Sequence, residues 1–242
     1  NKGLLFTFLT ASALKKLKMG KEALEVIEEF KTAPGVIAFP YIYYLKGSLL
    51  LYKGEYEASI KDMSAFLKEY KGLNLKKDAY YKMALAYKLK GDESTYQQYL
   101  IKTQKEGRNF FEADKQADKW AKEGINSDLR LLKARFNCDG GYVDEAERIL
   151  STVTAGSFKN IKDITEYFYR KGRIAEYQKK MSEAYKFYEQ TIETQQARPF
   201  YFAPNACLQL GYLYLPNNKT KARYYFKKAL TYRGHEYKNS ID

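Results

Sequence analysis

A two-helix motif recurs along the chain, and this recurrence constrains the fold more than any other feature. In each copy an aromatic or apolar residue is followed by a small residue, a bulky residue one helical turn later, and a turn. A second segment with small or apolar residues at helical spacing comes next. Alternating runs are short and the commonest apolar spacing is three and four, which predicts an all-α fold. A repeated motif of this kind is typical of stacked helical hairpins.

The small residue of each motif marks the point where the two helices of a hairpin would touch. Crossing helices approach closely only where a side chain is nearly absent, and bulky neighbours then fill the groove beside it. The small positions are Gly47, Ala84, Gly172 and Gly211. The positions one turn later are Leu50, Tyr87, Ala175 and Tyr214. The matching positions of the second helices are Tyr56, Ala146, Ala184, Ala222, Phe226 and Ala229.

At these positions the chain resembles the tetratricopeptide repeat (TPR) family, over nearly its whole length. The resemblance implies a right-handed superhelical solenoid of about six helix–turn–helix repeats. The repeats are divergent, since Gly47 and Ala84 lie 37 positions apart and Gly172 and Gly211 lie 39 apart, whereas the family's usual period is about 34. In the fifth unit Lys179-Lys180 occupies the turn where the family has glycine.

We expect one repeat domain over residues 1–242, made of six units and one extra helix. The predicted units are 3–32, 41–70, 77–105, 127–153, 162–195 and 203–233. The stretch 109–123 does not fit the two-helix pattern, but Ala113, Ala117 and Trp120 fall on one helical face. The pattern therefore predicts an extra helix there, at the place where the superhelix would bend or break.

The segment from Gly3 to Leu14 has two interpretations. It has the length of the apolar region of a signal peptide and ends in small residues. Leu5, Leu9 and Ala13 also fall on one helical face, and we favour this amphipathic helix. The chain begins with Asn rather than Met, so we expect it to be a piece of a longer protein. No apolar run reaches 18 residues, so the sequence predicts no membrane-spanning helix.

The chain is basic, with 42 Lys and Arg against 29 Asp and Glu and a net charge of +13. Such a charge favours acidic partners, among them nucleic acid, anionic membrane surfaces and acidic peptides. The basic residues come as scattered pairs such as Lys15-Lys16 and Lys227-Lys228, and no block of five or six like charges occurs. We therefore interpret the pairs as parts of solvated helix faces.

Catalytic motifs are missing from the sequence. Catalytic triads and metal clusters commonly use histidines, and this sequence contains a single one, His235. No phosphate-binding loop, HExxH pair, GxSxG elbow or GxGxxG turn occurs. We predict no cofactor, no metal and no catalytic residue. Cys138 and Cys207 form no CxxC motif, which is compatible with a reducing compartment and slightly favours the cytoplasm; a periplasmic or secreted location stays open.

In the TPR family the first helix of each pair lines a concave groove that takes peptides or partner helices. The corresponding positions here are Tyr44, Ser48, Tyr81, Leu85, Leu131, Arg135, Tyr169, Arg173, Leu208 and Tyr212. Tyr and Arg make strong interface contacts, and Arg binds carboxylates through two parallel hydrogen bonds. Several of these tyrosines could instead pack between repeats, since a shift of one residue moves a side chain from groove to core. The Asn-containing carboxylate clamp of chaperone-binding members is not matched.

The resemblance implies a protein-interaction scaffold that binds a peptide or partner protein, with an acidic partner favoured by the charge. The alternative is a nucleic-acid-binding helical array that uses the basic charge and stacks bases on its 24 tyrosines. That alternative predicts binding that weakens steeply with added salt. An enzyme is a third possibility and would need a pocket with convergent polar groups. The oligomeric state stays open.

Overall fold

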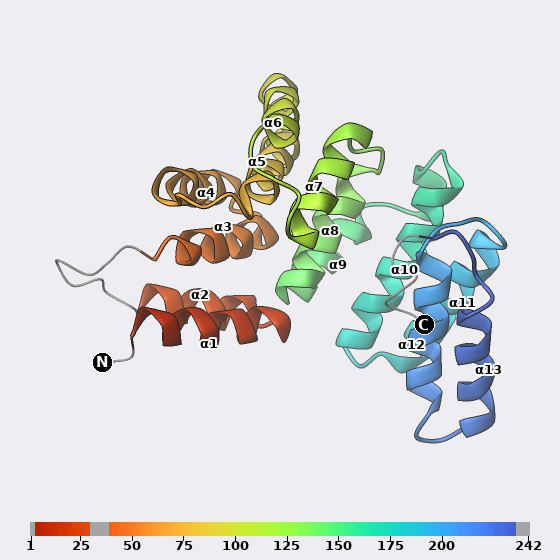
Figure 1. Ribbon diagram of the computed structural model, residues 1–242. Helices are drawn as coiled ribbons and strands as arrows, with labels where there is room; N and C mark the ends of the chain where they lie inside the picture. The colour runs from red at the N-terminus through yellow and green to blue at the C-terminus, as the bar shows by residue number, and fades with distance from the viewer. Residues whose placement is uncertain (1–2, 30–38, 236–242) are drawn as a thin grey trace. The chain divides into compact units, whose positions relative to one another are not determined.

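The computed structural model describes residues 3–29 and 39–235, and within these residues the chain forms thirteen α-helices, one short 3-10 helix and no strand. Short turns join α1 to α2, α3 to α4, α5 to α6, α10 to α11 and α12 to α13, and the two helices of each of these pairs pack on each other as a hairpin (Figure 1). The prediction of an all-α fold built from TPR-like hairpins is confirmed, including the extra helix near residues 109–123. Residues 30–32 of the first predicted unit lie outside the described residues.

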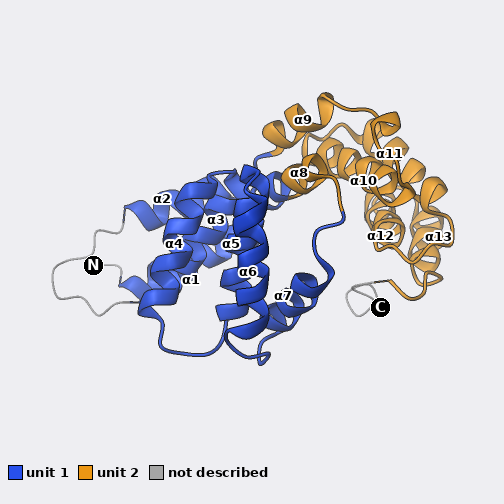
Figure 2. Ribbon diagram, turned by 90° about the horizontal axis from the view of Figure 1, so that it is seen from above, with its two compact units in different colours: residues 1–126, 136–142 blue, residues 127–135, 143–242 orange. Residues whose placement is uncertain are grey.

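The chain divides into two compact units, shown in different colours in Figure 2. Unit 1 consists of residues 1–126 and 136–142, and unit 2 consists of residues 127–135 and 143–242. Helix α8 (Leu129–Gly140) supplies residues to both units. That all six hairpins belong to one domain stays a prediction.

Unit 1 is built from three successive hairpins and the extra helix. Its helices are α1 (Leu4–Lys16), α2 (Gly20–Glu28), α3 (Tyr41–Lys53), α4 (Tyr56–Glu69), α5 (Lys76–Lys90), α6 (Glu93–Lys105) and α7 (Glu112–Glu123). Each hairpin pairs a first helix with a second, and the first helices also pack on one another, α1 on α3 and α3 on α5. Helix α7 has no hairpin partner of its own and packs on α5 and α6.

Unit 2 continues the hairpin pattern. Its remaining elements are α9 (Val143–Ser151), the 3-10 helix η1 (Ala155–Ser157), α10 (Ile161–Tyr177), α11 (Met181–Gln195), α12 (Phe202–Tyr214) and α13 (Lys219–Ala229). Helix α10 pairs with α11, and α12 pairs with α13. The core between these hairpins is aromatic, with Tyr188 and Phe202 buried completely or nearly so.

The helices of three hairpins touch at the small residues that the sequence singles out. A methyl group on Gly47 of α3 would lie 3.1 Å from Met63 of α4. On Gly172 of α10 it would lie 2.7 Å from the ring of Tyr188, and on Gly211 of α12 it would lie 2.3 Å from a ring of α13. The glycines therefore set the distance between the paired helices, because any side chain there would push them apart.

The inter-helix turns are less regular than the family pattern. Lys18 and Lys179, at two turns where glycine is expected, adopt the left-handed conformation with φ of 59°. The first inter-helix turn ends before Gly20, which is already the first residue of α2. Gly141 has φ of 84° and packs so closely on the Lys18 carbonyl that a methyl group would lie 1.9 Å from its oxygen.

Helix α1 forms as predicted, but its predicted apolar face is not the buried one. Leu5 and Leu9 are 59% and 56% exposed, and Ala13 is exposed as well. Ala11 is instead fully buried against a core that includes Ala23 of α2. The helix has apolar residues on both sides, so the spacing alone does not determine which side packs against the neighbouring helices.

Candidate functional site

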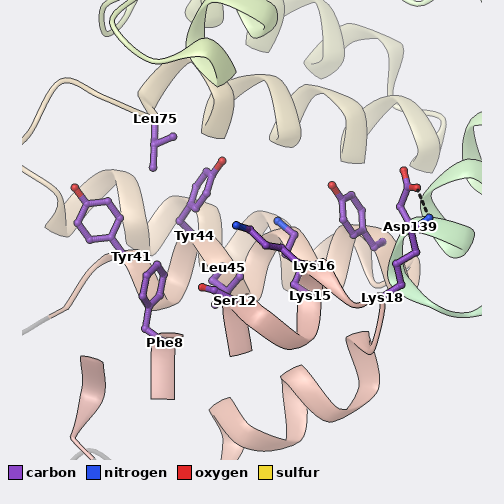
Figure 3. Close-up of a pocket in the computed structure, with 11 residues that line it drawn as sticks. Phe8, Ser12, Lys15, Lys16, Lys18, Tyr41, Tyr44, Leu45, Leu75 and Asp139 are labelled. Carbon is purple, nitrogen blue, oxygen red and sulfur yellow. Dashed lines mark ion pairs between the residues drawn. The ribbon is translucent and has the colours of Figure 1, made fainter. Parts of the chain in front are cut away.

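A pocket of about 380 Å³ opens in unit 1 on the side of the first helices (Figure 3). Helix α1 contributes Phe8, Ser12, Lys15 and Lys16, and helix α3 contributes Tyr41, Tyr44, Leu45 and Tyr52. The lining is completed by Lys18 in the first turn, Leu75 just before α5 and Asp139 at the end of α8. The pocket thus combines aromatic walls with three lysines and one carboxylate.

The aromatic walls are held by contacts with neighbouring rings. The ring of Tyr41 lies 6.2 Å from that of Phe8, and its hydroxyl lies 3.1 Å from the hydroxyl of Tyr70. The ring of Tyr44 packs 5.3 Å from that of Phe66, which is fully buried. Because each ring has a packed neighbour, the walls present a fixed apolar surface to a ligand.

A polar cluster beside the pocket fixes Tyr44. Its hydroxyl donates a hydrogen bond to the buried carboxylate of Asp78, and Lys82 donates to the same carboxylate and to the Tyr44 hydroxyl, at 3.2 Å from the latter. Burial and the nearby Asp78 charge raise the pKa of Tyr44 well above its usual range. Tyr44 therefore stays protonated, and the Asp78 carboxylate is already matched by Tyr44 and Lys82.

The lysines of the pocket differ in whether a carboxylate pairs with them. Lys18 forms an ion pair with Asp139 at 3.7 Å, which Figure 3 marks with a dashed line. The Lys15 ammonium lies 5.3 Å from the centre of the Tyr52 ring, and among the described residues neither Lys15 nor Lys16 forms an ion pair. The pocket is therefore basic, with two ammonium groups that lack a carboxylate.

Burial lowers the pKa of Lys15 to about 8, and the charge of Lys82 adds to this effect, while Asp78 and Asp139 oppose it. The expectation that Lys15-Lys16 forms part of a solvated face is therefore wrong for Lys15, which is half-buried. Lys16 is exposed at the rim, and both side chains extend from α1 into the space beside Tyr44 (Figure 3). Because its pKa is about 8, the Lys15 amine gains and loses its proton close to neutral pH.

The residues predicted to line a groove divide into two sets. Five are buried: Ser48, Tyr81, Leu85, Leu131 and Tyr169. Tyr81 packs on the Trp120 ring at 5.7 Å, and Tyr169 packs on the Phe202 ring at 5.8 Å. Their burial agrees with the interpretation that they pack between helices. The other five are half-buried or exposed: Tyr44, Arg135, Arg173, Leu208 and Tyr212.

These partly exposed residues lie in different settings. Tyr44 lines the pocket of unit 1. In unit 2, Arg173 already donates to the Glu176 carboxylate at 3.2 Å and to the Tyr177 hydroxyl at 2.6 Å. Tyr212 is 56% exposed and meets the Phe226 ring edge to face. Their roles in binding stay predictions.

The contribution of α1 to the pocket is not predicted from the sequence. No groove position was assigned to the first unit, although Lys15-Lys16 stands at the end of its first helix. The Lys15-Lys16 pair at the end of the first helix, with Tyr52 in the next hairpin, is the sequence signal that could have indicated the pocket. This signal is weak, because lysines are common in the last turn of any helix.

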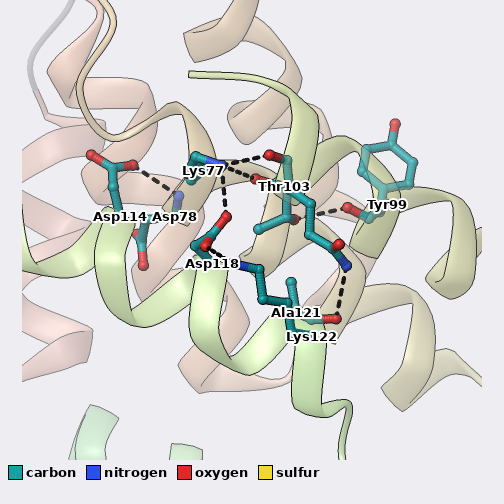
Figure 4. A network of polar contacts seen from close by, with 9 residues as sticks. Lys77, Asp78, Tyr99, Thr103, Asp114, Asp118, Ala121 and Lys122 are labelled. Carbon is teal, nitrogen blue, oxygen red and sulfur yellow. Dashed lines mark hydrogen bonds and ion pairs between the residues drawn. The ribbon is translucent and has the colours of Figure 1, made fainter. Parts of the chain in front are cut away.

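A second polar cluster, shown in Figure 4, attaches α7 to α5 and α6. The buried Lys77 ammonium donates to the carbonyls of Thr103 and Gln104, at 3.0 and 2.7 Å, and to the Asp118 carboxylate at 2.8 Å. Lys122 pairs with the other Asp118 oxygen at 2.6 Å. Burial acts against the Asp118 charge, but Lys122 and Lys77 outweigh it and hold the pKa of Asp118 below its usual value. The three N–H donors of the Lys77 ammonium each have an acceptor, so the cluster holds α7 against α5 and α6.

Neither a metal centre nor a membrane segment is evident in the part of the chain that the structure describes. No group of three or more His, Cys, Asp or Glu side chains lies close enough to hold a metal ion. No described helix has both the length and the apolar character that crossing a bilayer requires. Cys138 and Cys207 are both buried, and no disulfide joins them.

The hairpins define the chain as an all-helical protein built from repeated helix–turn–helix pairs. No protein-family model and no curated protein matches it. Among solved structures, it is similar to the C-terminal part of a TPR repeat-containing protein from Cytophaga hutchinsonii, with 18% identity over 97% of this chain and 98% of that one. The TM-score of that comparison is 0.37, and the fold assignment rests on the helices of this chain alone.

Proposed function

We propose that the chain is a protein-interaction scaffold that binds a peptide or partner protein on the face formed by its first helices. The observation that supports this function best is the pocket of unit 1. Its walls come from α1 and α3, the first helices of two successive hairpins, and include Tyr44, one of the predicted groove residues. Helical repeat proteins commonly use such surfaces for binding.

The composition of the pocket suits recognition of a partner side chain. Protein interfaces concentrate their binding energy in small, well-packed pockets lined by aromatic residues. A volume of about 380 Å³ lies toward the lower end of the range of ligand pockets and is enough for one or two side chains. In unit 2 we propose Arg135, Arg173, Leu208 and Tyr212 as further partner contacts, because they are the predicted groove residues that retain exposure.

Photo-crosslinking from two serine positions tests this function. Ser12 of α1 lines the pocket, whereas Ser64 is an exposed residue of the second helix α4. Each serine is replaced separately by a photoreactive phenylalanine analogue, and the protein is irradiated in an extract of its source organism. We expect a discrete protein adduct from position 12 and none from position 64, identified by mass spectrometry.

Three results would count against the scaffold. Equal labelling from both positions, or no protein adduct from position 12, would remove the proposed binding face. If the adduct at position 12 disappears after nuclease treatment, the bound species is nucleic acid rather than a protein partner.

A further inference from the structure

The chemistry of the same pocket indicates what kind of partner segment it takes. We propose that the pocket binds an acidic segment of the partner, with a Glu or Asp carboxylate between Lys15 and Lys16 and an adjoining apolar side chain against Phe8, Tyr41 and Tyr44. This inference rests on the proposed scaffold function and names the chemistry of the partner at that site.

The charges around the pocket leave a place for one carboxylate. The Asp139 carboxylate is paired with Lys18, and the Asp78 carboxylate is matched by Tyr44 and Lys82. No described carboxylate pairs with Lys15 or Lys16. The charge of Lys82 acts against that of Lys15, so a carboxylate at Lys15 would relieve this repulsion and accept a charge-assisted hydrogen bond, with Lys16 at the rim as a second donor.

The surroundings of the two lysines favour a carboxylate over a phosphate. Lysine acts as a point charge toward either anion, and no arginine lines this pocket to add the fork that recognises phosphate through two parallel hydrogen bonds. Lys15 and Lys16 lie in the last turn of α1, where the helix carbonyls carry partial negative charge. A phosphate dianion would meet more repulsion there than a single carboxylate does, so a side chain of Glu or Asp fits better.

The apolar walls indicate that the bound segment carries an apolar side chain next to its carboxylate. The Lys15 ammonium is half-buried against Tyr52, so a carboxylate that reaches it loses part of its own hydration. Burial of an aromatic or aliphatic side chain against the Phe8, Tyr41 and Tyr44 rings would offset that loss. A segment with an apolar residue next to an acidic one therefore matches both parts of the pocket.

A pair of short peptides tests the inference directly. The probes are acetyl-Gly-Phe-Glu-Gly-amide and acetyl-Gly-Phe-Gln-Gly-amide, each with 4-fluorophenylalanine, titrated by fluorine NMR into the whole protein. We expect the Glu peptide to bind about tenfold more tightly than the Gln peptide, a difference of about 1.4 kcal/mol. In Lys15→Met or Lys16→Gln the preference should fall toward unity, because the cations that recognise the carboxylate are gone.

Lys228→Met is the matched control. Lys228 also lies in the last turn of its helix, 5.7 Å from the Tyr224 ring, but it belongs to unit 2. It should leave the Glu preference unchanged. Circular dichroism of every variant shows whether it is folded, and the exposed position of Lys16 makes Lys16→Gln the safer of the two pocket variants.

The pH dependence offers an independent measurement. The titratable groups around Lys15 are Lys16 on its own helix, Lys18 in the first turn, Tyr41, Tyr44 and Tyr52 of α3, Asp78 and Lys82 of α5, and Asp139 of α8. The pKa of Lys15 is about 8 in the free protein. The affinity for the Glu peptide should therefore fall between pH 7 and pH 9 in the parent protein, and much less in Lys15→Met.

Several results would overturn the inference. Equal affinity for the Glu and Gln peptides, or no binding of either, would show that the pocket does not recognise an acidic segment. A Gln peptide with a free terminal carboxylate that binds as tightly as the Glu peptide would assign the site to a chain terminus instead. Displacement of the Glu peptide by a short oligothymidine at physiological salt would assign it to nucleic acid.

These results are distinguishable from failure of the scaffold itself. If position 12 still crosslinks a protein while the peptides show no preference for Glu, the scaffold stands and the acidic segment is wrong. If position 12 yields no protein adduct, the scaffold fails whatever the peptides show.

Discussion

Replacing Lys77 with Met should release α7 from unit 1 before the rest of that unit unfolds. Methionine keeps the apolar stem of the side chain but removes the hydrogen bonds to Thr103, Gln104 and Asp118. The Asp118 carboxylate would then remain buried with Lys122 as its cation. Because Asp118 lies on α7 and Lys77 on α5, the substitution weakens the attachment between these helices more than either helix itself.

The magnitude follows from the burial of the pair. The Lys77 and Asp118 side chains are 6% and 11% exposed, so solvent screens their interaction little. Removing one partner of a buried ion pair costs about 3–5 kcal/mol. We expect about 3 kcal/mol, the lower end of that range, because Lys122 still compensates part of the charge. The double variant Lys77→Met, Asp118→Leu removes the buried charge altogether and should regain about half of the loss.

The single tryptophan makes the release of α7 measurable. Trp120 lies on α7 and packs 5.7 Å from the Tyr81 ring of α5, so its fluorescence reports on this contact. In urea unfolding of Lys77→Met, the fluorescence transition should move to lower urea than the transition seen by circular dichroism. Lys119→Met, which removes an exposed pair with Glu123 at 3.9 Å, should change the stability by less than about 0.5 kcal/mol. Coincident transitions and a loss below about 1 kcal/mol in Lys77→Met would refute the reasoning.

Three further predictions concern a helix contact, a turn and a titration. Gly211→Ala should lower the thermal midpoint by overpacking worth about 1–3 kcal/mol, since the new methyl would lie 2.3 Å from the Phe226 ring; an unchanged midpoint would contradict this. Lys179→Gly should stabilise the protein against urea by up to about 1 kcal/mol, because φ is 59° there, whereas Lys180→Gly, with φ of −84°, should not. Relative to Lys15→Met, the parent should gain stability as pH rises from about 8 toward 10.5, since folding lowers the pKa of Lys15 and so penalises its charged form; a stability difference that stays flat over this range would argue against a buried ammonium.

The hairpins could be predicted because the property that forms them is local. A glycine such as Gly47 or Gly172, followed by a turn and a second amphipathic segment, specifies a close helix crossing whatever surrounds it. Helix α7 could be predicted for the same reason, from the spacing of its apolar residues. Its attachment could not, because Lys77 and Asp118 are 41 residues apart and neither stands out in the sequence.

The site was harder to predict because it depends on which side of each helix faces the solvent. Consecutive helix positions differ by about 100° in direction, so a small error of register exchanges groove and core. Ser48 is fully buried and donates a hydrogen bond to the Tyr44 carbonyl, whereas Tyr44 itself, one turn earlier on α3, lines the pocket. Ser48 shows that a polar residue at a groove position can be satisfied within its own helix and need not face a partner.

The contrast between two lysines of unit 1 separates a structural role from the binding role that we propose. Both are at least partly removed from water, which disfavours their charge. Lys77 offsets this cost with two carbonyls and a carboxylate of its own chain, so nothing is left for a ligand to supply. Lys15 is held against the Tyr52 ring without an ion-pair partner among the described residues, and burial, together with the charge of Lys82, lowers its pKa. A carboxylate of a partner would supply the ion pair that Lys15 lacks. The acidic partner that we propose is therefore favoured by this one ammonium group rather than by the basic charge of the whole chain.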